Sequence, residues 1–214
     1  MSKSNLIRWG GLAAMLGGLM WTGSWLLNAQ TLEGNRTFLG LTEGNYRAML
    51  NPALLGMLFG LVGMYALHAG RFGKLGKIGF ATSFLSLAMG LVGNVVEFGL
   101  VGEVTRSIGW FIMFPMFFVW PFGMLLFGLA VLRAKGLPRW SNALPLLIGV
   151  VLVLAIFLGV TEMLTCRCGR AERMLDLLFF TTSLGWIALG YRLWSGKGER
   201  ARQPEPAMLP GRLR

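Results

Sequence analysis

The chain has 214 residues, of which 55% are hydrophobic and only 14% are charged, and its mean hydropathy is +0.62. A soluble domain carries about a quarter charged residues, so this composition excludes an ordinary soluble protein. The net charge of +11 does not indicate nucleic-acid binding, because the basic residues lie between apolar runs and at the C-terminus. Composition therefore predicts an all-α, multi-pass membrane protein whose partners are membrane lipids and not nucleic acid.

Six apolar segments follow one another along the chain, each long enough to cross about 30 Å of hydrocarbon as a helix. The predicted spans lie near residues 8–28, 50–69, 78–101, 109–132, 143–164 and 174–194. The first run is longer than a signal-peptide core and carries Trp21 and Trp25, so we expect it to be retained. Residues 1–194 are thus one transmembrane bundle, and the basic, Pro-rich tail 195–214 is predicted to be disordered.

The lysines and arginines predict the orientation of the bundle. With the N-terminus inside, the cytoplasmic segments hold 14 basic residues and the outer segments hold 6. Cytoplasmic loops carry the excess of positive charge, so both termini are predicted to be cytoplasmic. The last outer segment opposes this bias, since it alone contributes Arg167, Arg170 and Arg173.

Two stretches, "LIRWGGLAAMLGGLMW" (6–21) and "LLFGLAVLRAKGLPRWSNALPLLIGV" (125–150), carry a family resemblance. They resemble small six-span bacterial membrane proteins of unassigned function, in which a span ends in a basic Gly-x-Pro-Arg-Trp turn. Here that turn is residues 136–140. The resemblance implies a bacterial cytoplasmic (inner) membrane protein and implies no activity.

Small residues recur at a spacing of four in the first two spans. Gly10, Ala14 and Gly18 form a strip along one predicted helix, and Gly56 and Gly60 share the spacing in the next. Such patterns let helix backbones touch. They predict close packing within the bundle, with a homo-oligomer or a larger membrane complex as the alternative.

Three acidic residues lie near the outer ends of predicted spans, where a charge is costly and marks a functional hypothesis: Glu97, Glu162 and Asp176. Glu162 needs a cation because it lies at a helix C-terminus. We expect these carboxylates to pair with Arg167, Arg170 and Arg173 in one outer charge network. A structural clamp is favoured over a proton or substrate site.

The fourth span, "GWFIMFPMFFVWPFGMLLFG", is rich in aromatic residues and contains two prolines. Each proline removes a backbone hydrogen bond and bends a helix, which opens space beside it. The span therefore predicts an apolar groove for a lipid tail, a quinone or another lipophilic small molecule, with a merely packed or lipid-facing helix as the alternative. The predicted groove residues are Phe114, Pro115, Phe118, Pro121 and Phe122.

The only cysteines, Cys166 and Cys168, flank Arg167 in an outer segment. They are predicted to be a thiol pair, with a labile disulfide as the alternative, and a metal site ranks last because too few ligands accompany them. The single histidine, His68, is predicted to lie at the membrane interface on the opposite side. We predict no metal and no cofactor.

No sequence motif for nucleotide binding, zinc hydrolysis or serine catalysis occurs in the chain. The first functional hypothesis is a non-catalytic accessory or lipophile-binding membrane module. The second is a small transporter or channel that uses Asn94 and Glu97, and the third is an intramembrane enzyme acting on a lipid or quinone.

Overall fold

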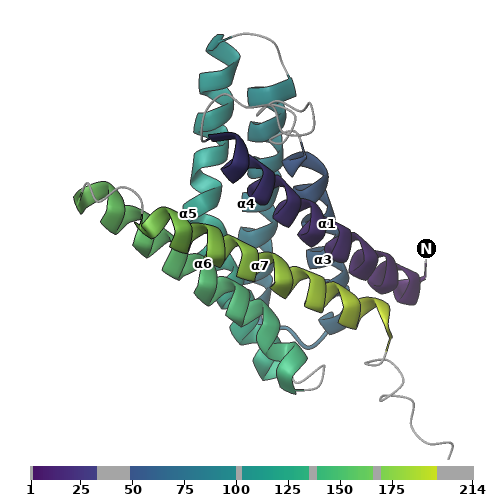
Figure 1. The fold of residues 1–214 in the computed structure, drawn as a ribbon. Helices are drawn as coiled ribbons and strands as arrows, with labels where there is room; N and C mark the ends of the chain where they lie inside the picture. The colour runs from purple at the N-terminus through teal and green to yellow at the C-terminus, as the bar shows by residue number, and fades with distance from the viewer. Residues whose placement is uncertain (1, 33–48, 100–102, 135–138, 166–169, 197–214) are drawn as a thin grey trace, which may run out of the picture.

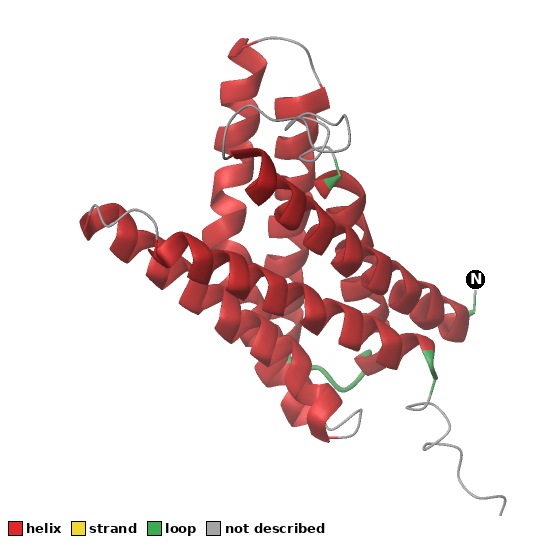
Figure 2. Cartoon of the chain, viewed as in Figure 1, coloured by secondary structure: helices red, strands yellow, loops and turns green. Residues whose placement is uncertain are grey.

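The computed structural model describes residues 2–32, 49–99, 103–134, 139–165 and 170–196. Some residues at helix ends are placed in their helix without a described side chain, namely 26–32, 98–99, 103–106, 139–140, 162–165 and 170–176. Every regular element in these ranges is a helix (Figure 2), so the predicted all-α fold is confirmed.

The six helices of the described ranges occur at the positions of the six predicted spans. Their bounds are α1 Lys3–Leu32, α3 Leu50–His68, α4 Lys74–Gly99, α5 Glu103–Ala134, α6 Arg139–Thr165 and α7 Arg170–Trp194. Several extend past the predicted spans, because hydropathy marks the apolar stretch whereas backbone hydrogen bonding continues through the adjoining polar turn. Both Pro115 and Pro121 lie inside α5, which continues through them as one helix.

Four of the helices are long and apolar enough to cross a membrane, judged on the described residues. These stretches are Leu50–His68, Lys74–Glu97, Ser107–Ala134 and Ser141–Thr161. Large apolar side chains are exposed on them and also on α1 and α7, for example Leu16, Leu19 and Leu177. A helix that presents Leu and Phe outward on this scale is suited to lipid rather than to water.

The helices form a closed ring in which each packs against its neighbours in sequence (Figure 1). The ring is closed by α1 and α7, the first and last helices, which pack side by side. Consecutive helices run in opposite directions (Figure 1). The start of α1 and the end of α7 therefore lie at the same end of the bundle.

Two glycine seams on α1 explain how it packs tightly on two sides. Gly10 and Gly17 face α3, where a Cβ on Gly17 would lie 2.8 Å from the carbonyl oxygen of Ala53. Gly11 and Gly18 face α7, where a Cβ on Gly11 would lie 2.7 Å from the carbonyl oxygen of Gly190. The predicted single strip is therefore wrong in one respect, because Gly18 belongs to the α7 seam. The glycines serve packing within the bundle, as expected of small residues in membrane helices.

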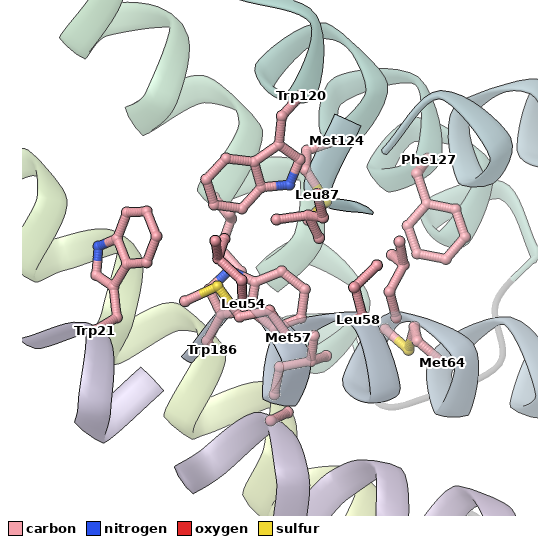
Figure 3. Close-up of a cluster of buried hydrophobic side chains, with 14 of the residues drawn as sticks. Trp21, Leu54, Met57, Leu58, Met64, Leu87, Trp120, Met124, Phe127 and Trp186 are labelled. Atoms are coloured by element: carbon pink, nitrogen blue, oxygen red, sulfur yellow. The ribbon is translucent and has the colours of Figure 1, made fainter. Parts of the chain in front are cut away.

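The interior of the ring is filled by side chains from all six helices, among them three fully buried tryptophans and several methionines (Figure 3). Trp21, Trp120 and Trp186 reach the centre from α1, α5 and α7. Met57, from α3, is fully buried in the same core, where a flexible thioether can fill irregular gaps. The middle of the bundle is therefore a packed core.

Candidate functional site

An apolar groove of about 210 Å³ lies between α5, α6 and α7. The α5 wall is aromatic and consists of Phe114, Phe117, Phe118 and Trp120. The α6 wall is aliphatic and small, and consists of Leu152, Ala155, Ile156, Gly159 and Val160. From α7 the lining residue is Phe179. These side chains offer carbon surface and almost no hydrogen-bonding groups, so the groove suits a hydrocarbon ligand.

The groove exists because the α5–α6 contact is closed at one end and open at the other. At the closed end Gly128 packs on Leu146, and a Cβ on Gly149 would lie 2.7 Å from the amide nitrogen of Leu125. At the open end the bulky rings of α5 face Ala155 and Gly159, which are too small to fill the space beside them. The lining positions of α6 recur at i, i+3, i+4 and i+7, so they form one helix face.

Stacked aromatic rings support the inner side of the groove. Phe179 stacks on Trp25 with ring centroids 4.3 Å apart and an interplanar angle of 10°. Trp120 meets Trp21 edge-on, with centroids 6.0 Å apart. Phe179 and Trp120 are each held by a ring from α1, so the inner side of the groove is preformed. The outer rings Phe114 and Phe118 contact each other along α5, with centroids 5.0 Å apart.

The structure places only part of the predicted groove set on the wall. Phe114 and Phe118 line the groove. Pro115, Pro121 and Phe122 are not among its lining residues, and the Phe122 side chain is 56% exposed on the outside of α5. Sequence reasoning missed the α6 wall, because the run "LVLAIFLGV" is apolar throughout and carries no periodicity that singles out one face.

A buried polar cluster lies on α3 and α4, away from the groove. The Asn94 side chain is fully buried and donates a hydrogen bond of 2.7 Å from Nδ2 to Oδ1 of Asn51. Glu97, one turn further along α4, is only 8% exposed. Its backbone packs on Gly109 of α5, where an added Cβ would lie 2.7 Å from the Glu97 Cα. The side chain of Glu97 is thus largely buried where α4 packs against α5, and it is not exposed at the surface.

The rest of the predicted outer charge network lies outside the described side chains. Glu162 is placed on α6 and Asp176 on α7, without their side chains. The same holds for Arg170 and Arg173 of α7, while Arg167 lies in the undescribed segment 166–169. That segment also contains both cysteines, Cys166 and Cys168, so the network and the thiol pair both stay predictions.

His68 is enclosed where the sequence suggested an interfacial residue. Its side chain is fully buried, and Nδ1 donates a hydrogen bond of 3.1 Å to the carbonyl oxygen of Met64. The imidazole stacks on Phe72, with centroids 5.4 Å apart. Within the described residues no group of three His, Cys, Asp or Glu side chains is placed to hold a metal ion.

The described residues form an all-helical protein with four helices long and apolar enough to cross a membrane, and with an apolar groove between α5, α6 and α7. No family model, curated protein or solved structure matches this chain. Its function therefore has to be inferred from its own residues.

Proposed function

We propose that the protein is a non-catalytic integral membrane protein that holds a lipophilic small molecule in the groove between α5, α6 and α7. The observation that carries this proposal is the groove itself, which is preformed by stacked rings and lined by carbon. The alternative is that α5 is merely packed or faces lipid. That alternative does not explain why the small residues Ala155 and Gly159 lie opposite the aromatic rings of α5. The ligand class is a chain-like hydrocarbon, such as a lipid tail or the tail of a quinone.

In this proposal the protein spans a bacterial inner membrane six times with both termini in the cytoplasm. The exposed apolar side chains of α1 and α7 support two spans beyond the four helices that qualify by length and composition. The basic residues with described side chains belong to helix ends and turns at the end of the bundle that holds the N-terminus: Lys3, Arg8, Arg71, Lys74, Lys77, Arg133 and Arg192. At the opposite end, Arg106, Arg170 and Arg173 are placed in their helices without described side chains. This asymmetry fits the excess of positive charge on the cytoplasmic side.

Photocrosslinking tests the proposal directly. The purified protein is incubated with a phospholipid that carries a diazirine in its acyl chain, and labelled peptides are mapped by mass spectrometry. We expect labelling on the groove faces of α5 and α6, and at least about a fivefold loss in the Ala155→Phe variant, since a ring of that size fills the groove. The matched control is Leu154→Phe, which adds a ring at the neighbouring position that is 50% exposed.

Equal labelling of the wild type and the Ala155→Phe variant would contradict the groove as a binding site. Because a large ring at position 155 also perturbs packing, the smaller Ala155→Leu change serves as a second variant. It partly fills the same space, so it should lose an intermediate share of the label.

A transporter or channel is the second proposal, and the enclosed carboxyl group of Glu97 is the observation that favours it. Charged residues inside membrane helices commonly mark ion or proton pathways. Flux through reconstituted vesicles should then fall in the Glu97→Gln variant while the protein still folds. Groove occupancy should not change in that variant, which separates the two proposals.

A further inference from the structure

A second cavity, of about 200 Å³, lies between the beginning of α1 and the end of α7. Its lining residues are Asn5, Arg8, Trp9, Leu12 and Trp194. The four α1 residues recur at i, i+3, i+4 and i+7, so they form a single face of the helix. The cavity thus has a different chemistry from the groove, because it combines a guanidinium group, an amide and two indoles.

The close approach of the two helices creates this cavity. A Cβ on Gly11 would lie 2.5 Å from the amide nitrogen of Trp194, so only glycine lets the last turn of α7 come this near. The indole of Trp194 is thereby brought beside the Arg8 face of α1. Trp9 and Trp194 are 60% and 45% exposed, as expected for indoles at headgroup level in a membrane.

Arg8 has no acidic neighbour on the helices that form the cavity. The first acidic residue of the chain is Glu33, and none occurs between residues 177 and 198 of α7 and its continuation. Among the described residues no acidic side chain lines the cavity beside Arg8. The cavity is therefore a cationic site with no acidic side chain among its lining residues.

Apolar side chains continue from the cavity along both helices. On α1 the face that carries Arg8 and Leu12 continues to the exposed side chains of Leu16 and Leu19. On α7 the exposed side chains of Tyr191 and Leu184 lie before Trp194, at helical spacing from it. A cationic end that leads into carbon surface matches a molecule with a charged head and hydrocarbon tails. Arginine suits the head, because its planar donor fork binds phosphate oxygens in pairs.

We propose that this cavity binds the phosphate group of an anionic membrane phospholipid. Arg8 pairs with the phosphate oxygens, the Asn5 amide donates a further hydrogen bond, and the two indoles pack at the level of the headgroup. The acyl chains lie along the outer faces of α1 and α7. This site is separate from the groove, and it does not depend on the function proposed for the groove.

Lipid binding to the full-length protein in a neutral detergent tests the proposal. Thermal unfolding and native mass spectrometry are measured with phosphatidylglycerol and with phosphatidylcholine of the same chains. We expect phosphatidylglycerol to raise the melting temperature and to stay bound, and the zwitterionic lipid to do so at least about tenfold more weakly. The Arg8→Gln variant should lose about tenfold or more in affinity, the value of one charge-assisted hydrogen bond.

Arg71→Gln is the matched control, since Arg71 is an exposed arginine at the same end of the bundle but outside the cavity. It should bind phosphatidylglycerol like the wild type. Ala155→Leu should also keep this binding, so a failure of the groove proposal does not affect the result. Equal lipid binding by Arg8→Gln and the wild type would overturn the site. Binding of inorganic phosphate as tight as that of the lipid would overturn the assignment to a lipid.

Discussion

The contact between α5 and α6 is tight at one end and open at the other. At one end Gly128 and Gly149 bring the backbones together and leave no space. At the other end Phe114 and Phe118 face the small residues of α6 and leave a groove. Small residues alone therefore do not determine whether two membrane helices close on each other. A glycine closes the contact when it meets a backbone, and it opens a groove when it stands beside rings held by other neighbours.

A substitution at the tight end of the α5–α6 contact should have the largest effect on stability. Gly149→Leu places side-chain atoms where the α5 backbone now lies, and overpacking typically costs about 1–3 kcal/mol and occasionally more. We expect a large fall in the melting temperature in detergent, or loss of the folded protein. An unchanged melting temperature would show that the α5–α6 contact is not as close as described.

A contact held by hydrogen bonding and not by glycine provides an intermediate case. Asn94→Ala removes the donor to Asn51 in the buried polar cluster. Interhelical hydrogen bonds in membrane proteins contribute about 0.6–1.7 kcal/mol, so we expect a loss in that range. The free energy of unfolding, measured with the Asn51→Ala single variant and the double variant, gives the coupling between the two side chains. A coupling energy near zero would contradict the bond.

Filling the open end should have a smaller effect on stability and the opposite sign. Ala155→Leu adds carbon to the groove, and cavity-filling substitutions commonly stabilise by about 0.5–2 kcal/mol. The variant should therefore melt at a higher temperature while it retains less lipophile. If it is destabilised as strongly as Gly149→Leu, the two ends of the contact do not differ in the way described.

The smallest effect is expected at a glycine where an added side chain would meet no described atom. A Cβ on Gly23 of α1 would meet nothing within 4 Å. Gly23→Ala should thus gain about 0.5–1 kcal/mol from helix propensity alone, which gives the effect of a substitution without a packing change. A loss of stability in thermal unfolding would mean that the outer side of α1 is covered by a partner or a second copy of the chain.

Hydropathy was sufficient to predict the helices, because the apolar composition of each stretch is a local property. The aromatic run of α5 likewise led to Phe114 and Phe118, two residues of the groove wall. The α6 wall was not predictable, since every residue of its run is apolar and only the packing selects Ala155 and Gly159. Which positions of α6 line the groove and which face outward depends on the neighbouring helices. The sequence of α6 alone does not indicate it.

The seams of α1 show the same limit in another form. A spacing of four suggested one strip through Gly10 and Gly18, whereas the doublets Gly10-Gly11 and Gly17-Gly18 are seven residues apart and serve two different helices. A heptad spacing keeps each glycine of a doublet on its own face over two turns. The doublets were visible in the sequence, but their meaning depends on α1 having a neighbour on each side.

The ring closure between α1 and α7 also determines the order in which the molecule is completed. Synthesis of the chain from the end of α1 to the end of α7 takes roughly ten to thirty seconds at about 5–20 residues per second. During that time the face of α1 with Gly11 and Gly18 has no helix to pack against. The Thr22 hydroxyl, which donates a hydrogen bond of 2.7 Å to Ser183 Oγ in the folded protein, has no partner on α7 yet. The first helix to be synthesised is thus among the last to be fully packed. The cavity beside Arg8 is complete only when the last turn of α7 has been synthesised.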